Sequence, residues 1–136
     1  MRVIAIDIRG SKAAFAALEG TEGSISDLTG KFTSLDLKDQ KDSAEIKRFQ
    51  HTVFDFFRGI GANKIAVLGK NTGGKFMGSA VSFKLEGLIQ CFQDTDVEII
   101  SPQTIAAFEK KHEIPILAKY TYQRDAARLA AYLISN

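Results

Sequence analysis

The sequence has one cysteine, two prolines and no tryptophan among its 136 residues. The lone Cys91 cannot form an intramolecular disulfide, so an apolar core has to hold the fold. No apolar stretch approaches the roughly 20 residues that cross a bilayer, and the opening MRVIAID leads into a strand without the pattern of a signal peptide. We therefore expect a cytoplasmic protein with no membrane partner.

A large excess of one charge is also missing. The chain carries 18 Lys and Arg against 16 Asp and Glu, a formal net charge of +2. The net charge alone therefore does not indicate a nucleic acid partner. A local cluster of basic residues would be needed to support one.

Hydrophobic residues, by contrast, are plentiful: they make up 45% of the chain and include ten phenylalanines. In a chain of this length they can fill one substantial core. The sequence shows no repeats, linkers or low-complexity segments, so we predict a single domain over residues 1–136.

The hydrophobic pattern predicts three strands followed by alternating helices and strands. Short turns should join strands at residues 2–8, 12–19 and about 25–37, the last interrupted near Gly30, into an antiparallel meander. A helix should begin at Asp42, where Glu45 completes a capping box, and end at Gly59 or Gly61. Further strands are expected at 64–68 and 97–100, and further helices around 81–92, from Ser101 and over 122–134. The prediction is an α/β fold with a mixed sheet: a three-stranded meander followed by helix–strand–helix–strand–helix units.

An aspartate interrupts the first strand, whose other residues are apolar. An ionised Asp7 in a buried strand costs several kcal/mol unless a metal, a donor or a cation meets it. One interpretation is a catalytic or metal-binding carboxylate, since such groups gather at functional sites. The other is a structural carboxylate that accepts donors from the Gly10–Ser11 turn or pairs with Lys70 or Arg128.

The glycine- and lysine-rich segment after the fourth strand has the spacing of a phosphate-binding loop. Residues 69–75 satisfy its glycine and lysine positions, but Phe76 stands where the magnesium-binding Ser or Thr belongs. This disfavours nucleoside triphosphate hydrolysis and leaves either an anion-binding loop or a solvated one.

The element order, with Asp7 on the first strand and Asp125 on the last helix, resembles the RNase H-like superfamily. The segment from the fourth strand through the third helix resembles the RuvC-type Holliday junction resolvases. The strings Gly74–Gly78 and Ser82–Glu86 are more similar still to a small bacterial family of unknown function within that superfamily. The resemblance implies an RNase H-like fold.

In the nucleases of this superfamily, carboxylates from the first strand, the end of the fourth strand and the last helix hold two divalent metals, Mg²⁺ or Mn²⁺. By resemblance, Asp7 and Asp125 match the first and last positions, and Glu86 is a further catalytic candidate. The carboxylate expected at the end of the fourth strand is missing. Lys70 stands near its place, and a lysine repels a metal ion. A homodimer is implied by the resemblance alone.

Two functions remain open. The first is a metal-dependent nuclease or resolvase with a degenerate active site, in which Asp7 and Asp125 bind metal. The second is a non-catalytic domain that binds nucleic acid, phosphate or a protein, in which the acids pair with Lys70 and Arg128. In that case the Lys70 ammonium occupies the place of a metal beside Asp7, and Asp125 forms an i,i+3 ion pair with Arg128. The candidate phosphate-binding residues are Lys70, Gly74, Lys75, Lys84, Arg124 and Arg128.

Overall fold

The structure, a computed structural model, describes residues 1–70 and 79–136. Within these residues the strands are β1 (Arg2–Arg9), β2 (Lys12–Thr21), β3 (Ser24–Asp27), β4 (Ser34–Asp36), β5 (Lys64–Leu68) and β6 (Val97–Ile100). The helices are α1 (Ser43–Ile60), α2 (Ala80–Gln90), α3 (Pro102–Glu109) and α4 (Arg124–Ser135), with a 3₁₀ turn, η1 (Thr121–Gln123), directly before α4.

The described strands form one mixed sheet in the order β3-β2-β1-β5-β6, and β4 also pairs with β2. The β1–β2, β2–β3 and β2–β4 pairs are antiparallel, whereas β5 pairs in parallel with β1 and β6. The expected mixed α/β fold is confirmed. Residues 3–8 of β1 are all buried, which places the strand with the aspartate in the middle of the sheet.

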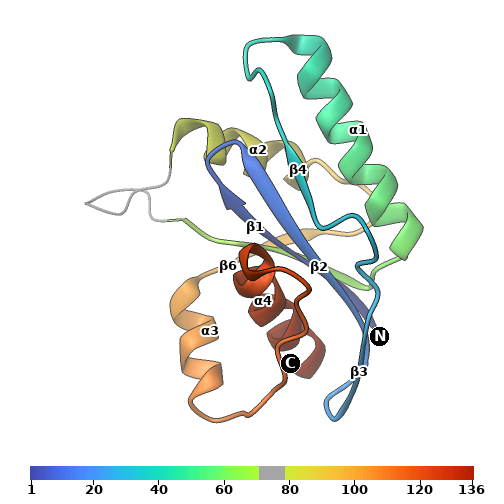
Figure 1. Cartoon of the computed structure of the whole chain (residues 1–136), viewed down its shortest axis with the longest axis vertical. Helices are drawn as coiled ribbons and strands as arrows, with labels where there is room; N and C mark the ends of the chain where they lie inside the picture. Colours follow the sequence, from blue (N-terminus) through green and yellow to red (C-terminus); the bar gives the residue numbers. More distant parts are fainter. Residues whose placement is uncertain (71–78) are drawn as a thin grey trace.

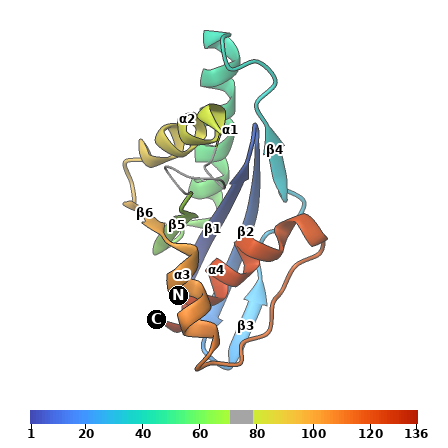
Figure 2. The same cartoon turned by 90° about the vertical axis from the view of Figure 1, so that its left-hand side faces the viewer.

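The two faces of the sheet are covered by different helices (Figure 1). In β1 the side chains of Ile4, Ile6 and Ile8 join the core under α1 and α2. Those of Val3 and Ala5 join the second core, under α3 and α4. Because side chains alternate along a strand, Asp7 lies on the α4 face. Figure 2 shows α4 lying across β1 and β2 on this face.

The predicted interruption of the third strand near Gly30 is present: β3 and β4 lie on either side of Gly30, which has a φ of 64°, and both pair with β2. One local prediction was wrong. The expected capping box is absent at the start of α1. The Asp42 carboxylate accepts from the Ala44 amide as predicted, but the Glu45 carboxylate accepts from the Lys38 amide and from Arg48 instead.

The predicted end of α1 and the predicted start of α3 are confirmed. Gly61, with a φ of 67°, ends α1, and the Ser101 side chain accepts from the Thr104 amide at the start of α3. In the part of the chain that the structure describes, no helix combines the length and apolarity that crossing a membrane requires.

Candidate functional site

Asp7 lies near the end of β1, and its side chain is only 2% exposed. The Lys70 ammonium, just beyond β5, donates to Oδ1 at 3.2 Å. The Arg9 guanidinium donates from Nε to Oδ2 at 3.0 Å. Each carboxylate oxygen of Asp7 therefore has a cationic donor. The predicted pairing with Lys70 is present, whereas no contact with Arg128 or the Gly10–Ser11 turn is found among the described residues.

Asp125 is held in the same way. Arg9 reaches from Asp7 to Asp125, with Nη2 donating to Oδ2 at 2.5 Å. The other oxygen, Oδ1, accepts from Nη1 of Arg128 at 2.9 Å, which is the expected i,i+3 pair on α4. Arg9 therefore bridges the two acids that the sequence singled out.

The contacts continue to α3. Arg128 donates from Nε and Nη2 to the two oxygens of Glu109, at 2.9 and 2.5 Å. Bidentate pairs of this kind are among the strongest charge-assisted hydrogen bonds. Positive and negative side chains thus alternate across β1, the end of β5, α4 and α3. We call this set the ion-pair chain: Lys70, Asp7, Arg9, Asp125, Arg128 and Glu109.

The ion-pair chain is electrically neutral overall, and its members reinforce one another's charged forms. The charge of Asp7, above other causes, raises the pKa of Arg9. The hydrogen bonds that Arg128 donates to Glu109 raise the pKa of Arg128 and lower the pKa of Glu109.

A cleft of about 590 Å³ opens over the part of the ion-pair chain formed by Lys70, Asp7, Arg9 and Asp125. Gly69 brings Lys70 to it: a Cβ at Gly69 would lie 3.2 Å from Ile99 Cγ2 and 3.3 Å from the Ile100 carbonyl oxygen, which the Gly69 amide contacts at 2.7 Å. The close approach to β6 therefore favours glycine at this position. The lining residues are Asp7, Arg9, Leu68, Gly69, Lys70, Pro102 and Asp125.

Glu86, the further catalytic candidate from the sequence, lies on α2. It is half-buried, and its Oε2 atom is buried without a hydrogen-bond partner among the described residues. Burial raises the pKa of Glu86, and the charge of Lys70 opposes the shift. The carboxylate of Glu86 is therefore within electrostatic reach of Lys70.

The remaining predicted residues do not join the ion-pair chain. Lys84 donates to the carbonyl of Gln40 at 2.6 Å, and Arg124 is exposed at the start of α4. Gly74 and Lys75, like Phe76, lie outside the described residues.

Sequence reasoning missed two members, Arg9 and Glu109. Arg9 had a usable signal, because it lies two residues after Asp7 on the same strand and so on the same face. Glu109 had none, since its contact with Arg128 depends on how α3 packs beside α4.

The arrangement does not fit the predicted metal pair. Among residues 1–70 and 79–136, no three His, Cys, Asp or Glu side chains come together as metal ligands, and residues 71–78 contain none of these residue types. Asp7 and Asp125 face each other across Arg9, and a lysine lies where a third carboxylate is expected. Protein cations occupy the carboxylate oxygens that Mg²⁺ or Mn²⁺ would need.

Solved structures share this fold. Thermus thermophilus RuvC superposes with a TM-score of 0.68 at 13% identity, over 96% of this chain and 92% of that chain. T. thermophilus RuvC in complex with a Holliday junction substrate gives a TM-score of 0.72 at 12% identity, over 96% and 91% of the two chains. At these identities the likeness shows the fold alone, which is the RuvC-like form of the RNase H-like fold.

Sequence comparison gives the family. No curated protein matches the sequence. Residues 1–133 match the family described as "Protein of unknown function (DUF3010)". The match spans all of the described strands and nearly all of α4, and the chain therefore belongs to the DUF3010 family.

Proposed function

We propose that residues 1–136 act as one RNase H-like domain that binds nucleic acid without cleaving it. The observation that carries this proposal is the ion-pair chain. Its cations contact both oxygens of Asp7 and both oxygens of Asp125, the two acids that match the metal ligands of the nucleases.

Metal entry would have to break these contacts. Separating Lys70 from Asp7 leaves a charge in a nearly enclosed place, since the two side chains are only 19% and 2% exposed. Removing one partner of a buried pair costs about 3–5 kcal/mol. A divalent ion would also meet the positive charges of Arg9 and Lys70 at the same carboxylate.

The nucleic acid part of the proposal has separate support. T. thermophilus RuvC, which shares the fold over 96% of this chain, is solved with a Holliday junction substrate. We assign phosphate contacts here to two exposed basic residues outside the ion-pair chain, Arg124 and Lys84. Lys75 and Gly74, which lie outside the described residues, are further candidates from the sequence. A homodimer, expected from the resolvase resemblance, is not required for this binding.

A metal-dependent nuclease is the second candidate, and one observation favours it. Glu86 places a partly buried carboxylate near Lys70, and its Oε2 has no partner among the described residues. In this alternative Asp7, Asp125 and Glu86 become the carboxylate set once the cations move away.

Paramagnetic broadening by Mn²⁺ separates the two candidates. We expect no localised broadening around Asp7 or Asp125 in ¹⁵N-labelled wild-type protein up to millimolar Mn²⁺. The matched variant is the double substitution Lys70→Glu with Arg9→Ala. It frees both oxygens of Asp7 and one of Asp125 and adds a third carboxylate, so localised broadening should appear.

Localised broadening in the wild-type protein that Asp7→Asn abolishes would favour the nuclease instead. A double variant that still shows no broadening would mean that the cations are not what keeps metal out.

Nucleic acid binding is tested in EDTA by fluorescence anisotropy with labelled four-way junction, duplex and single-stranded DNA. The same substrates are then incubated with Mg²⁺ or Mn²⁺. Binding in EDTA without cleavage in metal is the expected result. Metal-dependent cleavage that Asp7→Asn removes, or no binding to any substrate, would overturn the proposal.

A further inference from the structure

Two exposed tyrosines stack on each other just before α4. The rings of Tyr120 and Tyr122 lie with centroids 5.3 Å apart and planes 7° from parallel. They are 43% and 36% exposed, although both are large aromatic residues. Neither belongs to the ion-pair chain or to any predicted site.

Hydrogen bonds that are buried or partly buried hold this turn in place. The Tyr122 hydroxyl contacts the Thr33 hydroxyl at 2.5 Å. Gln123, only 1% exposed, accepts from the Tyr120 amide at 3.0 Å and donates to the Phe15 carbonyl at 2.9 Å. The turn is thereby attached to β2, so the aromatic surface is preorganised.

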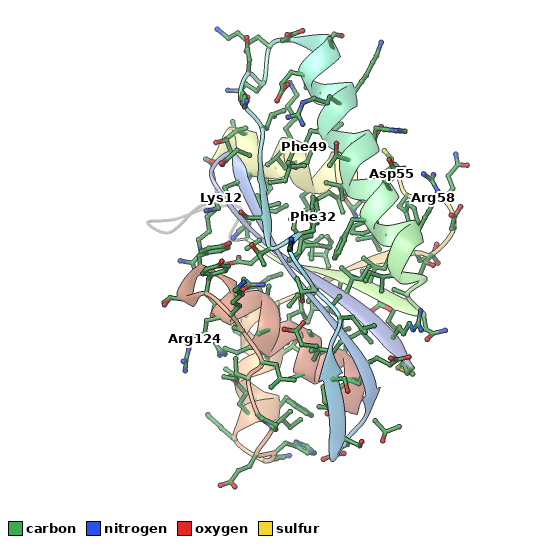
Figure 3. The ribbon with its side chains drawn as sticks, turned by 45° about the vertical axis from the view of Figure 1, so that its right-hand side comes forward. Lys12, Phe32, Phe49, Asp55, Arg58 and Arg124 are labelled. Carbon is green, nitrogen blue, oxygen red and sulfur yellow. The ribbon has the colours of Figure 1, made fainter. Side chains whose placement is uncertain are left out.

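Three cations surround the rings. Lys12 Nζ lies 4.1 Å from the centroid of the Tyr122 ring, and Lys119 Nζ lies 5.3 Å from that of Tyr120. Arg124 is exposed at the start of α4, and Figure 3 shows it on the same side of the molecule as Lys12. We call these five residues the tyrosine platform.

The charges of the platform are not neutralised as those of the ion-pair chain are. Among the described residues no carboxylate oxygen lies within 4.0 Å of the cationic groups of Lys12, Lys119 or Arg124. Residues 71–78 contain no Asp or Glu. Among the described residues, the cations at the tyrosines are therefore without a direct ion pair, whereas Lys70 and Arg9 in the cleft are both paired.

We propose that the tyrosine platform binds single-stranded nucleic acid, with an unpaired base stacked on an exposed tyrosine ring and phosphates held by its three cations. This inference rests on the proposed function and names its substrate class. Single strands bind proteins through such aromatic faces combined with basic side chains, whereas the bases of a duplex keep their faces covered. Lys119, Tyr120 and Arg124 also line a hollow of about 250 Å³ beside the ring.

The platform adjoins the cleft. Lys12 lies opposite Arg9 in the β1–β2 ladder, and Arg124 directly precedes Asp125 on α4. A bound strand can therefore continue from the tyrosines across the Arg9 side of the cleft. The neutral ion-pair chain would contact it without metal.

The test uses the full chain and a labelled oligothymidylate of about 12 nucleotides, a length within the range of single-strand binding sites. Anisotropy is measured in EDTA for wild type, Tyr120→Ala and Tyr120→Phe, beside a duplex of equal length. Tyr120→Ala should weaken binding by about 5- to 100-fold, and Tyr120→Phe, which keeps the ring, should bind within about twofold of wild type. Circular dichroism confirms that each variant is folded.

A charge variant with a matched control follows. Lys119→Gln should lower the slope of log K against log salt by about 0.7, the value for one phosphate contact to a single strand. Lys47→Gln, an equal charge change on an exposed position of α1, should leave the slope unchanged. The chain has no tryptophan and three tyrosines, so stacking should also quench its tyrosine fluorescence, and Tyr120→Ala should reduce the quenching.

The outcomes separate this inference from the proposed function. Equal binding of the single strand by wild type and Tyr120→Ala, or binding of duplex or junction alone, overturns the platform and leaves the proposed function standing. Failure of the wild-type protein to bind any nucleic acid overturns both. Saturable binding of a peptide or protein in place of nucleic acid would reassign the platform to a protein partner and overturn the inference as well.

Discussion

Asp7 joins Lys70 to Arg9 in the ion-pair chain. Replacing Asp7 by Asn removes the charge that both Lys70 and Arg9 contact. We expect the free energy of unfolding to fall by about 2–4 kcal/mol, since a partly buried ammonium loses its counter-charge. Urea denaturation should show a lower midpoint with an unchanged m-value.

Asp96→Asn, at an exposed position before β6, is the control and should change stability by less than about 0.5 kcal/mol. If Asp7→Asn stabilises the protein, the carboxylates repel one another as they do in an empty metal site. The ion-pair chain would then be the wrong description of this region.

The pKa of Glu86 gives a prediction with a definite pH dependence. Burial raises this pKa above its ordinary 4.5, so the unfolded chain ionises first. Glu86 therefore lowers stability as the pH rises through its raised value, and below pH 4.5 that loss is absent. Glu86→Gln should raise the melting temperature at pH 7 and leave it nearly unchanged at pH 4.

The exposed Glu98 on β6 provides the comparison for that pair of melting curves. Glu98→Gln should have little effect at either pH. A lower melting temperature for Glu86→Gln at pH 7 would show that the charged carboxylate has a favourable partner in the fold.

Single residues were predictable where burial and strand period decide their contacts. Asp7 was found because it interrupts a buried apolar run, and Lys70 because it follows the neighbouring strand. The position of Arg9 beside Asp7 follows from the same two-residue period of the strand, but Arg9 was not among the predicted site residues. The half-buried position of Glu86 could not be predicted from the apolar stripe of α2 alone.

At the scale of elements, substitutions at two glycines test whether each position needs the conformational freedom and small size of glycine. Gly20, in β2, has a φ of 133°, and a Cβ there would lie 1.9 Å from the Ser24 carbonyl oxygen. Gly20→Ala should therefore destabilise the β2–β3 hairpin by more than about 1 kcal/mol. Gly59 in α1 has open space around its Cα, so Gly59→Ala should stabilise the protein by about 0.5–1 kcal/mol.

Thermal or urea unfolding of the two variants gives opposite signs for the same chemical change. Equal effects would mean that the turn after Gly20 rearranges without cost. Amide hydrogen exchange in β2 and β3 then shows whether the loss in Gly20→Ala is confined to the hairpin.

Most elements were predictable because their apolar periods and end signals agree. The α1 helix begins at Asp42 and ends at Gly61 as its cap residues indicate. Prediction from the sequence is weakest where contacts between distant segments determine the local structure. Glu45 pairs with Arg48 and with the Lys38 amide, and the two short strands β3 and β4 exist only because β2 offers them an edge.

For the whole molecule, the neutral ion-pair chain predicts indifference to divalent metal. Stability rises with any ligand that binds the native state, so a metal site would be visible as a change in melting temperature. We expect wild-type protein to melt within about 1 °C in EDTA and in millimolar Mg²⁺ or Mn²⁺. The Lys70→Glu, Arg9→Ala double variant, tested in parallel, should melt higher with metal than with EDTA.

A metal-dependent rise in the wild-type protein would contradict the neutral arrangement. Neither the sheet order nor the net charge of +2 predicts the expected indifference to metal, because both are compatible with a metal nuclease. That indifference depends on side chains from β1, α3, α4 and the end of β5 meeting in one place.

The alternation of charge in that place also limits how such a protein can change over generations. Loss of any inner member, such as Arg9 or Asp125, leaves two neighbours of like charge without their common partner. A single substitution toward a metal-binding set therefore lowers the stability of the protein. Two substitutions would have to occur together to avoid that loss. Substitutions of several members at once are therefore the route by which the ion-pair chain can change without a large loss of stability.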